Sequence, residues 1–577
     1  MPNIDVVLTE IIRNRLVAAT EEMAKTLILT AYNPLLYEVQ DFSITIMSAE
    51  GDMWAETPGV IVFSQAFPDA VKAGIRRWQG QFEEGDVMIV NDPFETGTHI
   101  SDTNIYMPAY YNGELIAFCG IAAHWADIGG KSPGGWCSDT TDMYQEGMCF
   151  RHQKIVAAGK KNEALWDFIN DNVRVPIIVK GDLEAQIAAC RQGVARIQAL
   201  CGKYGPEVVG AAMDNVIQET DKAMRKEVAK LPPGEYAASI RLDSDGVNPD
   251  GDFLVCLNVN VQRDRIKFSL NGSSPTAQGP INLPAPCTRG ILASSIKGLL
   301  MPYDPCNAGH TQCLEFELPP ASIINPARPA PTDSYGYLVE CLMELMFRCF
   351  ANIVPEHCPA GGYQLTGGFI TRTQPEFGKP FIMSDPVHGG NGATHDGDGP
   401  TNQLIGNGDL PNNPVEVTET RHPVRVDRVE FAPEMGGAGK FNGGKGVRKD
   451  YRFLEDGCYS ALVIENTVDV TAKGVNGGGN GRPGYFVFNP GTPDEKVYTK
   501  RIASIGPFPK GTVFRSTTGG GGGWGSPLER DPQRVLADIR NGFTDAATAR
   551  AVCGVAVVEK QGEWVVDQAQ TQKLRAA

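Results

Sequence analysis

Apolar side chains in the first thirty residues recur at steps of three and four positions. The stripe consists of Ile4, Leu8, Ile11, Ile12, Leu16, Ala19, Met23 and Leu27. This spacing places the stripe on one face of a helix, so the chain is expected to open with an amphipathic helix. The same periodicity predicts helices over 182–201, 206–230 and 335–352 and a last one near 532–540.

A second pattern begins after the predicted second and third helices. The segment LPPGEY contains two prolines, which cannot continue a helix. Residues 253–262 and 265–274 then alternate apolar and polar positions, as paired strands do. Beyond Thr418 the chain reads as short strands and turns. Helices beside antiparallel strand clusters, without regular alternation of strand and helix, predict an α+β fold.

The length predicts more than one lobe. A chain of 577 residues exceeds the roughly 250–300 residues that one hydrophobic core supports. The changes of pattern divide it into an N-terminal lobe of helices and a metal-bearing mixed sheet (1–232), a mixed α/β middle lobe (233–430), and a strand- and glycine-rich C-terminal lobe with a terminal helix (431–577).

Two of the eight histidines lie where apolar runs end in polar, glycine-rich loops. His99 and Asp102 follow the strand-like run VMIV, and His124 comes directly after LIAFCGIAA. Loops at strand ends are where a rigid scaffold presents ligands. With Asp41 these residues offer two imidazoles and two carboxylates, which suit zinc, or manganese or iron at a higher coordination number. The alternative is that they are unrelated polar loop residues.

Several separated motifs carry a family resemblance. They are AYNPLLYEVQDFSITIMSAEGDMWAE, NDPFETGTHISDTNIYMP, AHWADIGGKSPGG, YQEGMCF and TTGGGGGWGSPLERDPQRVLADIRNGF. In order and across nearly the whole length, they resemble the hydantoinase B/oxoprolinase family. The resemblance implies the B component of an ATP-dependent cyclic-amide hydrolase, such as an N-methylhydantoinase, an oxoprolinase or a caprolactamase, with acetone and acetophenone carboxylases as distant relatives.

The metal-site pattern of that family falls on Asp41, His99, Asp102 and His124. Many members read HHAD where this chain reads HWAD, so the second histidine is replaced by Trp125. That position cannot supply a ligand. We expect Trp125 to form a wall of the substrate pocket instead.

The chain is not expected to bind ATP itself. The segment GKFNGGKGV has phosphate-loop spacing up to Lys445, but Gly446 stands where the loop needs a hydroxyl for magnesium. The resemblance implies that a hydantoinase A/oxoprolinase-type subunit uses ATP, in an (αβ)2 or similar hetero-oligomer. The glycine-rich stretches 474–484 and 517–525 are expected to be tight structural loops, with a pocket or subunit contact as the alternative for the second.

Five further residues are candidates for supporting roles. Asp127 and Glu146 are expected to act as a general base or to orient a ligand histidine, although either could be a helix cap or a loop ion pair. His388 and His395 lie in a polar, glycine-rich segment and are candidates for substrate contact, with a subunit contact, a second metal or a structural turn as the alternatives. Trp125 completes this set as a pocket wall.

The net charge of −16 disfavours nucleic acid or an anionic membrane as a partner, since both need a basic surface. No run of about 18 apolar residues and no basic, apolar leader is present, which predicts a cytoplasmic protein. The fourteen cysteines form no C-x-x-C motif and are expected to be reduced.

Three functions follow from these features. In the first, a metal activates water or a cyclic-amide carbonyl, whether of a lactam, a hydantoin or 5-oxoproline, while the partner consumes ATP. In the second, the chain belongs to an ATP-dependent ketone carboxylase. In the third it is a scaffold with a structural metal, which the lack of cysteine ligands argues against. The sequence favours the first.

Overall fold

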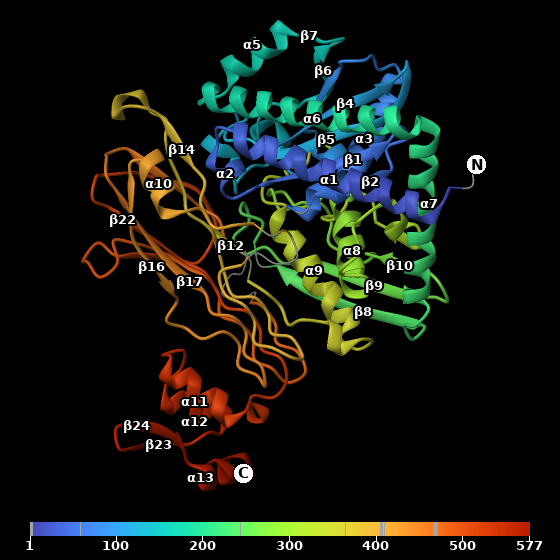
Figure 1. Cartoon of the computed structure of the whole chain (residues 1–577). Helices are drawn as coiled ribbons and strands as arrows, with labels where there is room; N and C mark the ends of the chain where they lie inside the picture. Colours follow the sequence, from blue (N-terminus) through green and yellow to red (C-terminus); the bar gives the residue numbers. More distant parts are fainter. Residues whose placement is uncertain are drawn as a thin grey trace.

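The computed structural model describes residues 4–57, 59–242, 244–363, 365–403, 408, 410–464 and 471–576. Helices and antiparallel strands occupy separate layers, which confirms the α+β prediction (Figure 1). The predicted helices all exist, with ends shifted by a few residues. They are α1 (Val6–Thr30), α6 (Pro176–Tyr204), α7 (Pro206–Val228), α9 (Gly336–Phe350) and α11 (Pro532–Arg540).

A seven-stranded sheet forms the centre of the N-terminal part, in the order β2-β1-β5-β4-β3-β6-β7. The strands are β1 (Phe42–Ser48), β2 (Met53–Thr57), β3 (Val87–Val90), β4 (Asp102–Tyr111), β5 (Glu114–His124), β6 (Arg151–Ala157) and β7 (Lys160–Lys161). Each pairing in it is antiparallel, so the prediction of a mixed sheet was wrong. The hairpin between β4 and β5 turns at Asn112 and Gly113, both with positive φ, and so short a connection can only join antiparallel strands.

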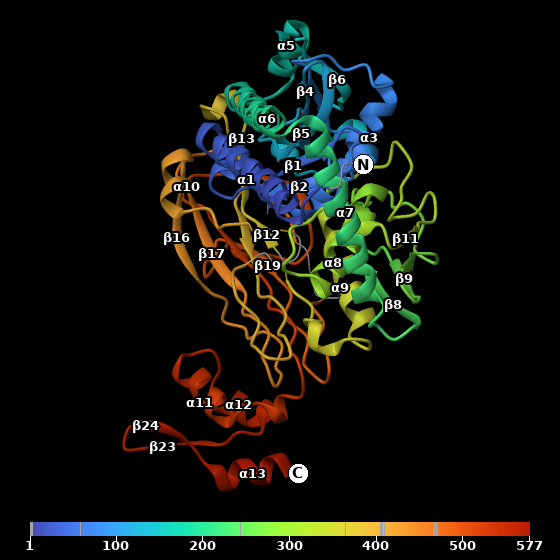
Figure 2. The same ribbon diagram turned by 45° about the vertical axis from the view of Figure 1, so that its right-hand side comes forward.

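Both faces of this sheet are buried. Alternate residues of β4 point in opposite directions: Ile105 packs with α1 and α6, whereas Tyr106 packs toward α3 (Ile61–Trp78). The apolar core on the Tyr106 side continues into the middle segment of the chain. There α8 (Ala285–Leu300) and α9 lie between the seven-stranded sheet and a second sheet, which the middle segment forms (Figures 1 and 2). One apolar core therefore joins the N-terminal and middle segments and fixes the strand ends against α9.

The middle segment contributes a four-stranded sheet in the order β11-β10-β9-β8. Its strands are β8 (Gly234–Leu242), β9 (Phe253–Val261), β10 (Ile266–Ser269) and β11 (Leu314–Glu317). Strands β9 and β10 pair as the alternating pattern predicts. Short helices α2 (Pro34–Tyr37), α4 (Pro93–Thr96) and α5 (Glu163–Asn172) occupy connections of the N-terminal part.

The rest of the chain is mostly strand. A two-stranded sheet (β12-β15), a four-stranded sheet (β14-β13-β18-β21) and a five-stranded sheet (β16-β17-β22-β19-β20) lie together. Their elements are β12 (Leu365–Gly367), β13 (Phe369–Arg372), β14 (Phe381–Met383), β15 (Pro386–His388), α10 (Val415–Arg421), β16 (Val424–Phe431), β17 (Val447–Phe453), β18 (Cys458–Leu462), β19 (Tyr485–Phe488), β20 (Lys496–Tyr498), β21 (Ile502–Phe508) and β22 (Val513–Thr517). Because β13 pairs with β18, the sequence-based boundary near residue 430 runs through a shared sheet. The division into three lobes remains a proposal.

Glycine-rich segments pack directly on one another beside these sheets. The amide of Gly437 donates to the Gly521 carbonyl at 2.7 Å, and that of Gly522 donates to Gly361 at 2.8 Å. A Cβ atom on Gly521 would lie 1.9 Å from the carbonyl oxygen of Asn391. These runs are therefore tight structural loops, as predicted, and their close backbone approach requires glycine.

The C-terminal end forms a small separate layer (Figure 2). It contains α11, α12 (Ala546–Cys553), β23 (Val557–Lys560), β24 (Glu563–Val566) and α13 (Gln568–Ala576) around their own apolar cluster. All fourteen cysteines are free thiols. Within the described ranges no helix is both long and apolar enough to cross a membrane.

Candidate metal centre

Three predicted ligands meet at the end of the β4–β5 hairpin. Asp102 is the first residue of β4, and His124 is the last residue of β5 and its direct cross-strand partner. His99 lies in the loop between α4 and β4. Sheet register therefore brings together residues that are 22 positions apart in the sequence.

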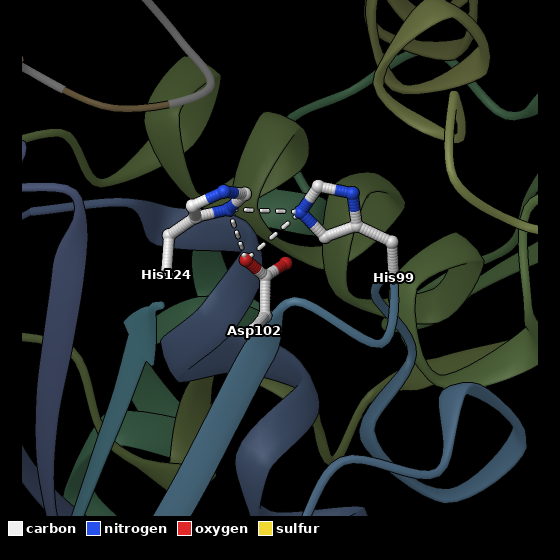
Figure 3. Close-up of side chains that lie close together, drawn as sticks. All are labelled: His99, Asp102 and His124. Carbon is white, nitrogen blue, oxygen red and sulfur yellow. Dashed lines mark hydrogen bonds and ion pairs between the residues drawn. The ribbon is translucent and has the colours of Figure 1, made fainter. Parts of the chain in front are cut away.

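The side-chain atoms form a compact triangle (Figure 3). His99 Nε2 and His124 Nδ1 each lie 3.0 Å from the same Asp102 oxygen, Oδ1. The two ring nitrogens lie 3.1 Å apart. All three residues are buried, with at most 5% of any of them exposed.

The electrostatics of the triangle favour a cation. Burial disfavours charge on the His99 ring, but the Asp102 carboxylate and Asp333 outweigh it and raise the pKa of His99 to about 9. Burial likewise opposes the Asp102 carboxylate, and the two histidines nevertheless hold its pKa below the usual value. These shifts favour a positive charge at the cluster, which either a proton or a metal ion could supply.

The hydrogen bonds around His99 orient it as a ligand. Its Nδ1 donates to the Asp333 carbonyl oxygen at 2.9 Å, which in the neutral ring leaves the Nε2 lone pair facing the triangle. Tyr335 donates its hydroxyl to the other Asp102 oxygen at 3.2 Å. The Trp136 ring stacks on His124, 5.4 Å between centroids, and on Phe369 at 3.9 Å.

The donor set fits a divalent metal ion. Two imidazole nitrogens and a carboxylate oxygen converge, with each of the three atoms 3.0 or 3.1 Å from the other two. Nitrogen and carboxylate oxygen without thiolate is the ligand set of zinc catalytic sites and of manganese and non-haem iron sites.

Asp41, the fourth predicted ligand, borders the same pocket without joining the triangle. Its backbone carbonyl accepts from the His124 amide at 3.2 Å, just before β1 begins. Its carboxyl lies outside the group of atoms within 4.8 Å of one another. Burial raises the pKa of Asp41 to about 6, with the nearby histidines opposing that shift. A role for Asp41 as the fourth ligand therefore remains a proposal.

The pocket beside the triangle is walled mainly by apolar side chains and closed by residues from distant segments. Its apolar lining consists of Val60, Phe63, Trp136, Leu410, Val463 and Ile464. Tyr337 and Glu340 of α9 and Arg501, which precedes β21, also border it. The N-terminal sheet, the middle helix and the C-terminal strands therefore all contribute to one site.

The two acidic residues predicted near the site hold loops in place. Asp127 is fully buried and accepts from the Arg174 side chain at 2.9 Å and from the Arg174 amide at 2.6 Å, so the loop ion pair is the alternative that the structure supports. Glu146 accepts from the amides of Thr332 and Asp333 at 2.8 and 3.0 Å. The backbone carbonyl of Asp333 accepts the hydrogen bond from His99 Nδ1. By fixing the backbone of Asp333, Glu146 therefore helps to orient His99, a candidate ligand.

Trp125 is not a wall of this pocket. Successive residues of a strand point to opposite faces, so the side chain after His124 enters the core under α6. There Trp125 is fully buried, and its Nε1 donates to Gln186 at 2.9 Å. Trp136, from the next loop, takes the place against His124 that the sequence suggested for Trp125.

The other two histidines lie elsewhere. His388, at the end of β15, is fully buried, and burial lowers its pKa to about 4. His395 is exposed in a loop, with its ring 6.4 Å from that of Trp524. Neither borders the pocket at the triangle, and contact with a substrate stays a prediction for both.

Sequence reasoning missed Asp333, Tyr335, Trp136 and Arg501. The first two lie in the polar segment TDSYG between a proline-rich connection and α9, and Trp136 lies in the glycine-rich loop SPGGW. A polar or aromatic residue in such loops is a weak signal. Arg501 had no local signal, because only the fold brings it to the pocket.

A buried His–Asp–His cluster at the strand ends of an antiparallel sheet defines this chain as a protein with a candidate metal centre. The hydantoinase B/oxoprolinase model matches residues 5–527, and the chain belongs to that family.

Three relatives align over 91% or more of the chain. The B component of a putative D-/L-hydantoinase from Pseudomonas sp. (strain NS671) is 29% identical, over 100% of this chain and 98% of its own length. The beta component of the caprolactamase from Pseudomonas jessenii is 27% identical over 100% of both chains. The 5-oxoprolinase 1 of Arabidopsis thaliana is 26% identical over 91% of this chain, which spans only 42% of that protein.

Solved structures share the fold. The crystal structure of ATP-dependent caprolactamase from Pseudomonas jessenii superposes with a TM-score of 0.90 over 100% of both chains, at 25% identity. A nucleotide-free acetone carboxylase structure gives a TM-score of 0.87 at 19% identity, over 99% of this chain and 82% of that one. The second likeness concerns the fold alone.

Proposed function

We propose that this chain is the metal-containing subunit of a two-component, ATP-dependent cyclic-amide hydrolase. The observation that carries the proposal is the buried triangle of His99, Asp102 and His124 beside an apolar pocket. Relatives that align along the whole chain and are named as hydantoinase and caprolactamase subunits support the substrate class.

His99, Asp102 and His124 would hold the metal, with Asp41 as the proposed fourth ligand from the same pocket. A divalent ion with an open position polarises a carbonyl and lowers the pKa of a bound water toward 7. We favour zinc, with manganese or iron as alternatives at a higher coordination number. The surrounding residues orient this centre: Asp333 fixes the His99 ring, and Tyr335 fixes the Asp102 carboxyl.

The apolar walls suit the methylene groups of a cyclic amide. Apolar walls around a bound substrate would also strengthen the electrostatic interactions of the polar groups in the pocket. Unstrained amides resist hydrolysis, so activation of the amide oxygen by phosphorylation would assist ring opening. We assign that step to a separate ATP-binding subunit of the hydantoinase A/oxoprolinase type.

Two observations support a partner. The segment around Lys445 uses its backbone amides within the glycine-rich packing: Gly444 donates to Asn391 at 2.9 Å and Gly443 donates to Gly437 at 2.8 Å. These amides are not arranged to hold phosphate. In addition, the region matched in 5-oxoprolinase 1 makes up 42% of that protein, so that enzyme contains a large further part.

The test is co-expression with an ATP-binding subunit of the hydantoinase A/oxoprolinase type, followed by an assay of the purified complex on lactams, hydantoins, 5-oxoproline and ketones, with and without bicarbonate. We expect ATP-dependent ring opening of at least one cyclic amide without bicarbonate. The matched control is a complex that carries His124→Ala, which should assemble and bind ATP but form no product. Bicarbonate-dependent consumption of a ketone, with no cyclic amide opened, would assign the chain to the carboxylases instead.

A further inference from the structure

Arg501 lies in the pocket with both terminal guanidinium nitrogens buried. Among the described residues, neither Nη1 nor Nη2 has a hydrogen-bond partner, and no carboxylate forms an ion pair with this side chain. The guanidinium lies over the face of the Tyr337 ring, with 3.9 Å from the guanidinium carbon to the ring centroid. The ring holds the planar group in place at the border of the pocket.

Such an arrangement is costly to the fold unless a ligand completes it. A guanidinium is always charged and carries five N–H donors, and burying a charge without a partner is unfavourable. Stacking on an aromatic ring offsets only part of that cost. Other arginines of the same region have their partners in the chain, as Arg515 does with both oxygens of Asp450 at 2.7 Å.

The position of Arg501 relates it to the candidate metal centre. Arg501 borders the same pocket as His99, Asp102 and His124, but it comes from the strand-rich C-terminal part of the chain. Apolar residues, among them Val463 and Ile464, also line this pocket. A ligand that fills it can therefore contact the metal centre, an apolar wall and a guanidinium at the same time.

We propose that Arg501 is an oxyanion-binding residue that holds a negatively charged group of the substrate beside the metal centre. The fork of N–H donors matches the paired oxygens of a carboxylate or a phosphoryl group. Under the proposed function, on which this assignment rests for its substrate, the oxyanion has two sources. It is either a carboxylate carried by the cyclic amide or the phosphoryl group placed on the amide oxygen.

Direct binding tests this assignment without any turnover. Inorganic phosphate and acetate are titrated by calorimetry into the metal-replete full-length chain, its Arg501→Gln and Arg501→Lys variants, and Arg425→Gln. Arg425 is an exposed arginine paired with Asp427 in the same part of the chain, so its loss matches the change in net charge. We expect at least one anion to bind about tenfold or more weakly to Arg501→Gln, with an intermediate loss for Arg501→Lys and none for Arg425→Gln.

Thermal stability distinguishes a binding role from a structural one. If the role of Arg501 is to bind a ligand, the thermal midpoint of Arg501→Gln should equal or exceed that of the wild type. The substitution removes a buried charge that has no partner in the ligand-free protein. A clearly lower midpoint together with unchanged anion binding would make Arg501 a structural residue and overturn the proposal. Failure of the wild type to bind either anion would overturn it as well.

Kinetics of the assembled complex identify the source of the oxyanion. If Arg501 holds a substrate carboxylate, Arg501→Gln should raise KM for 5-oxoproline and leave caprolactam unaffected. If it holds the phosphoryl group, kcat should fall for both substrates. Wild-type kinetics on every substrate turned over would contradict a role for Arg501. A complex that opens no cyclic amide, while Arg501→Gln still loses anion binding, would reject the proposed function and leave the anion site standing.

Discussion

At the scale of single residues, the candidate centre depends on groups that hold the ligands as much as on the ligands. One carboxylate oxygen of Asp102 contacts a ring nitrogen of His99 and one of His124. The other oxygen accepts a hydrogen bond from the Tyr335 hydroxyl. The hydroxyl therefore fixes which oxygen faces the triangle. Outer hydrogen bonds of this kind typically change metal affinity by about 10-fold to 100-fold.

Tyr335→Phe is accordingly expected to weaken metal binding by about 10-fold to 100-fold while the fold is retained, because only the hydroxyl is lost. Competition with a chromogenic chelator measures the affinity. The control is Tyr110→Phe, which removes a hydroxyl bonded at 2.7 Å to the Phe82 carbonyl. Equal affinities of the Tyr335→Phe variant and the wild type would mean that this hydrogen bond does not support the centre.

Residue types and their local context predicted part of the site and could not predict the rest. His99, Asp102 and His124 lie at strand ends within one hairpin and its preceding loop, so a local pattern brings them together. Trp125 was misplaced because a strand reverses its face at each residue. Arg501 reaches the pocket through pairing between strands that are far apart in the sequence. A local sequence pattern does not predict such pairing.

At the scale of elements, the helix α6 anchors the segment that leads to the first sheet strand. Asp182 of α6 accepts from the amides of Tyr32 and Asn33 at 2.7 and 3.1 Å. Its second oxygen is buried without a partner among the described residues. Burial raises the pKa of Asp182 from 3.8 to about 7, with the two amide hydrogen bonds opposing the shift.

A raised pKa means that the folded protein favours the protonated acid. The stability that Asp182 contributes is therefore full below about pH 4 and is lost as the pH rises to about 7. Asp182→Asn keeps an acceptor for the two amides and removes this titration. We expect the free energy of unfolding of the variant, relative to the wild type, to increase between pH 4 and 7 and to level off above.

Urea unfolding of both proteins at half-unit pH intervals measures that difference. Its full span is on the order of 4 kcal/mol, from about three pKa units at 1.36 kcal/mol each. The difference should be independent of salt, since no ion pair is involved. A difference that stays flat from pH 4 to 8 would show that Asp182 is ionised in the fold without penalty.

Elements were predicted better than their arrangement. The helices at 6–30 and 532–540 carry clear periodicity and end signals, and both form within two or three residues of the predicted bounds. The sheet of the N-terminal part was expected to be mixed, because the apolar runs of fully buried strands do not reveal strand direction. The shared sheet formed by β13 and β18 joins residues about ninety positions apart, beyond the reach of periodicity.

At the scale of the whole molecule, all three parts of the chain border the pocket, yet no described segment offers a phosphate loop. The candidate glycine–lysine segment is packed into the backbone of neighbouring glycines. The proposed function assigns ATP to another subunit. The isolated chain is expected to bind no ATP at micromolar concentration by calorimetry, whereas the complex with its A-type partner should bind it. Binding of ATP to this chain alone at micromolar concentration would contradict the assignment of ATP to a separate subunit.

Metal content per chain tests the central claim most directly. Elemental analysis is applied after exhaustive dialysis to the wild type, to the double variant His99→Ala/His124→Ala, and to His388→Ala as the control, since His388 is a buried histidine away from the pocket. We predict about one divalent metal ion per chain in the wild type and in His388→Ala, and none in the double variant. Stoichiometric metal in a folded double variant, or a wild type that binds no metal when zinc, manganese or iron is supplied, would contradict the account.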